Sequence, residues 1–213
     1  MYLTQGLHRD LAAQPDAVVT ITGSRKRTVR ELGDRVARLA GALHKLGVGK
    51  DDRIAYLGAN SDRFHEYYLG TFWADAVVNP VNTRWTASEI AYSLTDSDTR
   101  YLFADEVVLP KLGELRTLYP HLKATVWTGE GSAPQGMLEY EDLIAGAAPV
   151  ADARRGGDQL AGLFYTGGTT GFPKGVMLSH GNLVTGAPGS AVSRFAAPGA
   201  VFLHPAPMFH LAD

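Results

Sequence analysis

The fold class is decided by residues 28–57, TVRELGDRVARLAGALHKLGVGKDDRIAYL, because they hold a helix pattern followed by a strand pattern. Thr28 and Glu31 form a capping box, which is a signature of a helix N-terminus. Apolar residues then recur at helical spacing as far as Gly47, where the run ends. These residues are Leu32, Val36, Leu39, Leu43 and Leu46. Residues 53–57, RIAYL, read as a short strand, so we expect an amphipathic helix packed against a sheet.

The same alternation continues along the chain. Further helices are expected after Ser61 and after a second capping box formed by Thr86 and Glu89. A less regular helix that contains Pro110 is expected over residues 107–118. The expected strands are residues 76–80 (AVVNP), 101–104 (YLFA) and 124–128 (ATVWT). Strands alternating with helices predict an α/β fold with largely parallel sheets flanked by helices.

Composition excludes several classes of function. The 213 residues are 45% hydrophobic and 20% charged, which is typical of a globular protein. The net charge is −2 and the basic residues are scattered, which argues against nucleic acid as a partner. The absence of cysteine excludes disulfides, thiolate zinc sites and a cysteine nucleophile. No apolar run has the ~18 residues of a membrane span or the pattern of a signal peptide, so we expect a cytoplasmic protein.

Residues 165–175, YTGGTTGFPKG, are the main candidate for a binding site. Apolar runs lie on both sides, at 163–165 and 176–178, and predict a strand, a loop and a second strand. The glycines let the backbone approach a ligand closely, and successive N–H groups in such a loop can face an anion. Three threonine hydroxyls and the charge of Lys174 add to this, so the loop suits a polyphosphate.

The spacing within this loop excludes two common phosphate binders. A Walker A loop needs Gly, Lys and Ser or Thr in succession, but Phe172 and Pro173 separate Gly171 from Lys174. The dinucleotide pattern G-x-G-x-x-G is absent, and a strand rather than a helix follows. A plain surface hairpin would need neither three hydroxyls nor a lysine.

The stretch YTGGTTGFPKGV resembles the AMP-binding signature of the adenylate-forming superfamily, which includes acyl-CoA synthetases, luciferases and peptide-synthetase adenylation domains. Residues 28–61, 76–90 and 205–213 (PAPMFHLAD) also look like the corresponding parts of fatty-acyl-CoA synthetases. Gly167 stands where many members have Ser, although long-chain fatty-acid members resemble this sequence there. The resemblance implies the N-terminal, incomplete part of the large AMP-binding domain. Its expected parts are an α/β subdomain (1–128), a connecting segment (129–158) with one short helical piece at 140–144, and a phosphate-loop segment that runs into PMFH (159–213).

The resemblance also implies a two-step ligase reaction. A carboxylate attacks the α-phosphorus of ATP to give an acyl-adenylate and pyrophosphate, and a thiol, usually that of CoA, then displaces AMP. The loop would hold the β- and γ-phosphates, with Lys174 adding charge or fixing the loop. The other expected phosphate-binding residues are Thr166, Gly167, Gly168, Thr169, Thr170 and Gly171. A Mg²⁺ ion would bridge the phosphates, with the hydroxyl of Thr166 beside it.

Other residues have simpler expected roles. His210, in PMFH, would by resemblance orient the carboxylate or act as a gate, and a packed histidine at a strand end is the alternative. His180 is expected to cap a helix or to pack. We assign Trp73, Trp85 and Trp127 to packing, and we expect a solvated turn over residues 25–30.

Members of this family run to well over twice 213 residues, and their adenine and ribose sites, hinge and small C-terminal domain would follow residue 213. We therefore expect an N-terminal fragment of a medium- or long-chain fatty-acyl-CoA synthetase with little or no activity alone. The expected partners of the whole enzyme are a carboxylic acid, ATP and CoA. An aryl acid, a carrier-protein thiol, or a naturally short nucleotide-binding or interaction protein are the alternatives. A homodimer and peripheral membrane contact stay open.

Overall fold

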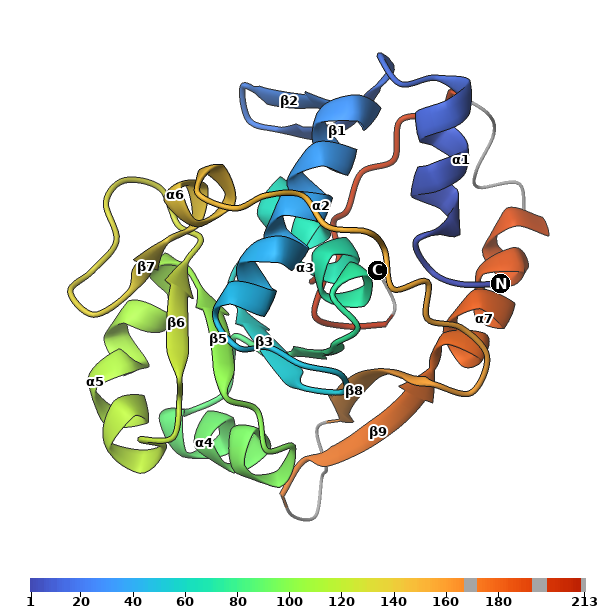
Figure 1. Cartoon of the computed structure of the whole chain (residues 1–213). Helices are drawn as coiled ribbons and strands as arrows, with labels where there is room; N and C mark the ends of the chain where they lie inside the picture. Colours follow the sequence, from blue (N-terminus) through green and yellow to red (C-terminus); the bar gives the residue numbers. More distant parts are fainter. Residues whose placement is uncertain (167–171, 193–198, 212–213) are drawn as a thin grey trace.

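The computed structural model describes residues 1–166, 172–192 and 199–211 (Figure 1). Within them, a seven-stranded sheet has the strand order β7-β6-β5-β3-β4-β8-β9. Its strands pair in parallel except for β8 and β9, which are antiparallel. They are β3 (Arg53–Leu57), β4 (Val77–Pro80), β5 (Tyr101–Ala104), β6 (Ala124–Trp127), β7 (Leu138–Glu139), β8 (Leu160–Thr166) and β9 (Lys174–Ser179). The expected α/β fold is confirmed.

Helices cover both faces of this sheet. On one face α2 (Val29–Lys45) packs with α3 (Asp62–Trp73), and on the other α4 (Ala87–Asp96) packs with α5 (Leu109–Leu118) (Figure 1). The other elements are α1 (Gln5–Ala13), the hairpin of β1 (Val18–Thr22) and β2 (Arg25–Thr28), η1 (Glu106–Val108), α6 (Tyr140–Ala145) and α7 (His180–Val192). The resulting helix–sheet–helix layers explain why the expected strands are almost continuously apolar.

Strand β3 supplies side chains to two separate hydrophobic cores. Ile54 and Tyr56 belong to the core beneath α2 and α3, whereas Ala55 and Leu57 belong to the core beneath α4 and α5. All four are fully buried, because successive side chains of a strand point to opposite faces of the sheet. The expected packing role of the tryptophans is confirmed by the burial of all three, Trp73, Trp85 and Trp127.

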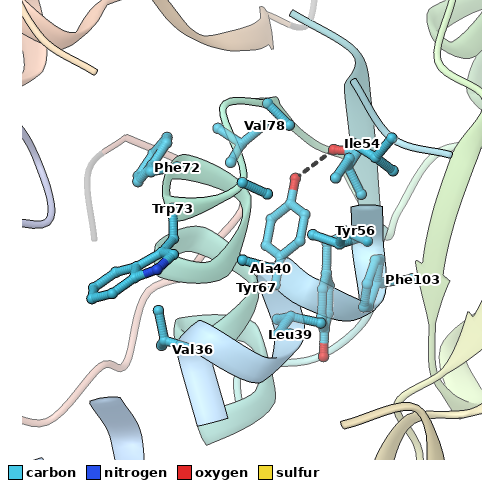
Figure 2. Close-up of a cluster of buried hydrophobic side chains, with 14 of the residues drawn as sticks. Val36, Leu39, Ala40, Ile54, Tyr56, Tyr67, Phe72, Trp73, Val78 and Phe103 are labelled. Carbon is cyan, nitrogen blue, oxygen red and sulfur yellow. Dashed lines mark hydrogen bonds between the residues drawn. The ribbon is translucent and has the colours of Figure 1, made fainter. Parts of the chain in front are cut away.

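Tyr67 joins helix α3 to the sheet (Figure 2). Its ring is fully buried among side chains of α2, β3 and β5, including Leu39, Tyr56 and Phe103. Its hydroxyl donates a hydrogen bond of 2.7 Å to the Ile54 carbonyl oxygen and accepts one of 3.0 Å from the Asn79 backbone N–H. The hydroxyl thus pairs with the backbone of two adjacent strands, which satisfies a polar group in the core.

Most of the expected elements are confirmed, several of them to the residue. Strands β3 and β5 have the expected bounds, and β4 and β6 are each one residue shorter than expected. Both capping boxes are present, at Thr28 with Glu31 and at Thr86 with Glu89. The irregular helix is η1 followed by α5, with Pro110 in the first turn, where its missing N–H removes no helical hydrogen bond.

The solvated turn expected over residues 25–30 is wrong. Arg25–Thr28 form strand β2, and the Arg25 guanidinium donates two hydrogen bonds, of 2.7 and 2.8 Å, to the buried carboxylate of Asp62. Burial alone would raise the pKa of Asp62, but hydrogen bonds from Arg25 and nearby arginine charges lower it. The arginines therefore neutralise acids on α3, which local sequence does not reveal.

Residues 129–158, expected as a connecting segment with one short helical piece at 140–144, contain that helix and one further packed element, a short strand. Strand β7 extends the sheet beyond β6, and α6 buries Tyr140 and Ile144. The Tyr140 hydroxyl donates a 2.7 Å hydrogen bond to Glu66 on α3. This segment therefore contributes to the core as well as linking two parts of the chain.

The capping box of α2 gives a direct stability prediction. The Glu31 backbone N–H donates to the Thr28 hydroxyl at 3.2 Å, and the Thr28 N–H donates to the Glu31 carboxylate at 2.7 Å. Thr28→Ala should lower the free energy of unfolding by about 1 kcal/mol, because the N–H of Glu31 loses its acceptor. Urea denaturation checks this, and an unchanged midpoint would show that the cap contributes nothing.

Candidate functional site: the β8–β9 hairpin and the 204–211 turn

The expected phosphate loop joins two paired strands, β8 and β9. Strand β8 also pairs with β4 in parallel, so the hairpin forms the last two strands of the seven-stranded sheet. Thr166 and Lys174 form the last strand pair before the loop. The expected phosphate-binding residues between them lie outside the described residues, and these are Gly167, Gly168, Thr169, Thr170 and Gly171.

The two described ends of this loop hold the expected hydroxyl and the expected charge. The Thr166 hydroxyl is exposed and lies 3.4 Å from the Lys174 carbonyl oxygen, to which it donates. Lys174 is also exposed. The structure therefore brings these two residues together and leaves both side chains accessible from solvent.

Both ends of the loop contact helix α4. The Tyr165 hydroxyl donates a 2.6 Å hydrogen bond to the Asp96 carboxylate, and burial followed by that carboxylate raises the pKa of Tyr165. On the other side Phe172 stacks on Tyr92, with ring centroids 4.6 Å apart. These two contacts fix the positions where the chain enters and leaves the loop.

Gly175 allows the strands to approach closely at the base of the loop. A Cβ atom at this position would lie 2.9 Å from the Tyr165 ring, which is closer than real Cβ atoms approach other atoms. The glycine in KG therefore has a packing reason that is separate from ligand binding. From the sequence alone, this glycine indicates only backbone freedom.

Helix α7 begins directly after β9. Ser179 and Asn182 cap it reciprocally: the Ser179 N–H donates to the Asn182 side-chain oxygen at 3.0 Å, and the Asn182 N–H donates to the Ser179 hydroxyl at 3.1 Å. Between them His180 is buried and packs edge to face against Phe72, with ring centroids 5.3 Å apart. The packing role expected for His180 is confirmed.

The buried imidazole of His180 should make stability depend on pH. Burial, with a smaller contribution from the charge of Arg155, lowers the pKa of His180 to about 4. An unfolded histidine titrates near ~6.5, so between these values the unfolded state binds more protons. Stability should therefore fall as the pH is lowered from about 6.5 to about 4, by at most ~1.4 kcal/mol per pH unit from this group.

His180→Gln should flatten this pH dependence, because the replacement cannot titrate. The measurement is the free energy of unfolding in urea at several pH values between 4 and 7. His65, whose pKa burial and the charge of His204 also lower to about 4, should retain its own share of the slope. Identical slopes in the wild type and in His180→Gln would contradict the prediction.

The PMFH motif lies in a turn beside α3. The Asn60 side chain donates to the carbonyl oxygens of His204, at 3.0 Å, and Ala206, at 2.6 Å, and it accepts from the Met208 N–H at 2.8 Å. Met208 and Phe209 are half-buried and pack against the core beneath α2 and α3. His210 has an exposed side chain, and its N–H donates to the Pro207 carbonyl oxygen at 2.9 Å.

Sequence reasoning missed Asn60 as well as the contacts of the loop ends with α4. The available signal for Asn60 was its place after the buried strand β3, at the carboxyl end, where ligand sites of parallel sheets occur.

The described side chains near the hairpin offer few ligands for a magnesium ion. The residues that the structure describes contain no cluster of three or more His, Cys, Asp or Glu side chains that could hold a metal ion. The exposed Thr166 hydroxyl could therefore supply one ligand, and substrate phosphates and water would have to supply the others. Over the same described residues, no helix is both long and apolar enough to span a bilayer.

Comparison with known proteins identifies a family for this arrangement. Residues 7–213 match the family described as AMP-binding enzyme. A long-chain-fatty-acid–CoA ligase of Thermus thermophilus is 38% identical over 75% of this chain and 29% of its own length. A 4-hydroxybenzoate–CoA/benzoate–CoA ligase of Rhodopseudomonas palustris is 36% identical over 76% of this chain and 30% of its own length.

A solved structure extends the likeness to three dimensions. The anthranilate CoA ligase AuaEII in complex with anthranoyl-AMP matches with a TM-score of 0.79 and 27% identity, over 84% of this chain and 35% of that one. The chain thus spans about a third of the length of these relatives, with values between 29% and 35%.

Proposed function

Because the chain belongs to the AMP-binding enzyme family, we propose that its residues form the N-terminal part of the large domain of an ATP-dependent acid–thiol ligase. The single observation that carries this proposal is the β8–β9 hairpin, which presents an exposed hydroxyl and an exposed lysine at the two ends of a glycine- and threonine-rich loop. The proposed parts are the α/β subdomain (1–128), the linking segment (129–158) and the phosphate-loop segment (159–213). A non-catalytic protein is not favoured, because the chain matches an enzyme family and the relatives named above are ligases.

The chemistry of adenylation gives the hairpin its task. A carboxylate oxygen of the acid forms a bond to the α-phosphorus of ATP, and the bond from that phosphorus to the bridging oxygen of pyrophosphate breaks. The leaving pyrophosphate gains negative charge, which fixed donors and cations stabilise. We assign this task to residues 166–171 and to the Lys174 ammonium group. When bound, Mg²⁺ would neutralise phosphate charge, and the Thr166 hydroxyl is the residue in this chain that we assign to its side of the site.

His210 is proposed to orient the substrate carboxylate from the turn beside α3. Its side chain is exposed, and the half-buried Met208 and Phe209 pack against the core beneath α2 and α3. The thiol that attacks the acyl-adenylate in the second step is proposed to be that of CoA, as in the names of the relatives.

The proposed acid is a medium- or long-chain fatty acid. Support comes from the relative of Thermus thermophilus and from a medium-chain acyl-CoA ligase of Mycobacterium avium that is 32% identical over 93% of this chain and 42% of its own length. An aryl acid is the second candidate, because the benzoate–CoA ligase of Rhodopseudomonas palustris is almost as similar.

Lys174→Gln should weaken the use of ATP without weakening the binding of the acid. In the full-length enzyme we expect kcat/KM for ATP to fall about tenfold, which corresponds to ~1.4 kcal/mol of lost charge stabilisation. The KM for the acid should stay within about twofold, since uniform binding of the acid is unchanged. The measurement is acid-dependent ATP–pyrophosphate exchange, with decanoate and benzoate as the test acids.

The matched control is Lys50→Gln, which removes another exposed lysine ammonium far along the chain from the hairpin. Equal rates for the Lys174 and Lys50 variants would show that Lys174 does not bind the phosphates.

We also propose that the 213-residue polypeptide alone does not catalyse exchange, since it spans only about a third of its relatives' length. Robust exchange by the isolated polypeptide would refute that part of the proposal.

A further inference from the structure

Asn60 uses its whole side-chain amide on one backbone turn. Its two N–H groups donate to the carbonyl oxygens of His204 and Ala206, at 3.0 and 2.6 Å, and its oxygen accepts from the Met208 N–H at 2.8 Å. Since two carbonyls lie opposite the nitrogen and one N–H lies opposite the oxygen, only this orientation of the amide satisfies all three groups. Asparagine therefore matches the turn chemically, and an aspartate or an apolar residue would not.

A second side chain contacts the same turn from the next helix. The Tyr68 hydroxyl, on α3, donates a 2.7 Å hydrogen bond to the Met208 carbonyl oxygen. Backbone atoms of residues 204–208 thus make four hydrogen bonds with two side chains, accepting three and donating one. The β3–α3 region therefore holds the turn through its backbone atoms, and these contacts do not depend on the side chains of the turn.

The backbone of Asn60 is itself held on both sides. The Ala59 N–H donates to the Asp105 carboxylate at 2.6 Å, and the Ser61 hydroxyl caps α3 by accepting from the Phe64 N–H at 3.2 Å. Because its backbone is held in this way, Asn60 can fix the position of the 204–208 turn, which lies more than a hundred residues later in the chain.

Asn60 and the β8–β9 hairpin lie at the same edge of the sheet. Asn60 follows the carboxyl end of β3, the loop at 167–171 follows the carboxyl end of β8, and β4 pairs in parallel with both strands. Two strand spacings separate β3 from β8, which is roughly 10 Å. A substrate carboxylate and the α-phosphate of ATP would have to meet across this interval.

We propose that Asn60 is a positioning residue: it fixes the 204–208 turn and thereby sets the place of His210 relative to the Thr166–Lys174 strand pair. This inference rests on the proposed ligase function for its catalytic consequence. The hydrogen bonds themselves do not depend on that function, so the two parts can be tested separately.

The first test measures amide hydrogen exchange of the Met208 N–H by mass spectrometry or NMR in the 213-residue chain. Asn60→Ala should accelerate exchange at Met208 by roughly tenfold, because the side-chain oxygen that accepts from this N–H at 2.8 Å is removed. Asn60→Asp keeps a side-chain oxygen for Met208 but loses both donors, so its effect on this amide should be smaller. Gln135→Ala, which removes an exposed amide from the loop between β6 and β7, is the matched control and should leave Met208 unchanged. Unchanged exchange in Asn60→Ala would overturn the proposal.

The second test measures adenylation by the full-length enzyme. Asn60→Ala should lower kcat about 10- to 100-fold while the KM for ATP stays within about twofold, because a displaced His210 disturbs geometry rather than ATP binding. Tyr68→Phe should have a smaller effect of the same kind. Faster exchange at Met208 with wild-type kcat would overturn the catalytic part of the inference. If the wild-type enzyme showed no adenylation with any acid, the proposed function would fail, while the exchange result would still decide whether Asn60 fixes the turn.

Discussion

Glu66→Ala should lower the free energy of unfolding by about 3 kcal/mol, because it removes the buried partner of the Arg35 guanidinium and leaves the buried Tyr140 hydroxyl without its acceptor. Glu66 is fully buried on α3 and accepts hydrogen bonds of 2.7 and 2.9 Å from the Arg35 guanidinium. It also accepts one of 2.7 Å from the Tyr140 hydroxyl. In the variant Arg35 would keep only its hydrogen bonds to Glu141, at 2.8 and 3.2 Å, and the Tyr140 hydroxyl would lose its acceptor. Urea or thermal denaturation followed by circular dichroism provides the measurement.

Glu130→Ala is the matched control for this prediction. Glu130 accepts a 3.1 Å hydrogen bond from Arg25, but its side chain is 74% exposed. Exposed ion pairs contribute at most about 1 kcal/mol, so this variant should stay close to the wild type. Similar losses for Glu66→Ala and Glu130→Ala would show that burial of the ion pair does not decide its contribution.

Tyr67→Ala should cost about 3–5 kcal/mol, the range for removing a large aromatic ring from a packed core. The ring is fully buried between α2, β3 and β5, and Figure 2 shows it enclosed by aliphatic and aromatic side chains. Loss of the ring would leave a cavity in the core beneath α2 and α3. The free energy of unfolding in urea is again the measured quantity.

Tyr67→Phe separates packing from hydrogen bonding. It retains the ring but removes the hydroxyl that donates to the Ile54 carbonyl oxygen and accepts from the Asn79 N–H. We expect a loss of about 1–3 kcal/mol, the cost of leaving a buried polar group unpaired. If Tyr67→Phe were as destabilising as Tyr67→Ala, the hydroxyl rather than the ring would hold α3 on the sheet.

The parts of the fold that could be predicted from the sequence are those determined locally. The capping boxes each join residues three positions apart, and strands such as RIAYL are apolar because both faces are buried. The order of the strands is not determined locally, since Val78 of β4 pairs with Gly162 of β8, which lies 84 positions later in the chain. No local pattern encodes such a pairing, so the order of strands came only from the structure.

The same limit explains the missed charges. Arg25 lies in a run of basic residues that reads as solvated, yet it binds Asp62, which lies 37 positions later. Opposite charges attract through space, and the sequence alone does not say which distant acid an arginine will meet. The sequence of α3 likewise does not indicate that the acidic side chains of Asp62 and Glu66 are buried.

The candidate site could be predicted only in part. The strand–loop–strand arrangement follows from the apolar runs around the glycines, whereas the pairing of Thr166 with Lys174 came only from the structure. The roles of Asn60, Asp96 and Tyr92 could not be predicted, because each acts on a segment distant in the chain. The chemical roles assigned to residues 166–171, Lys174 and His210 stay predictions.

The most direct test of the account is the nucleotide product of acid-dependent ATP turnover by the full-length enzyme. With decanoate, CoA and Mg²⁺, the account predicts AMP and pyrophosphate, because the carboxylate attacks the α-phosphorus while the hairpin holds the two outer phosphates. Chromatography of the reaction with ATP as the only nucleotide added measures this directly. Formation of ADP and phosphate would contradict it, since cleavage would then occur at the γ-phosphate and the hairpin could not serve as the site for leaving pyrophosphate.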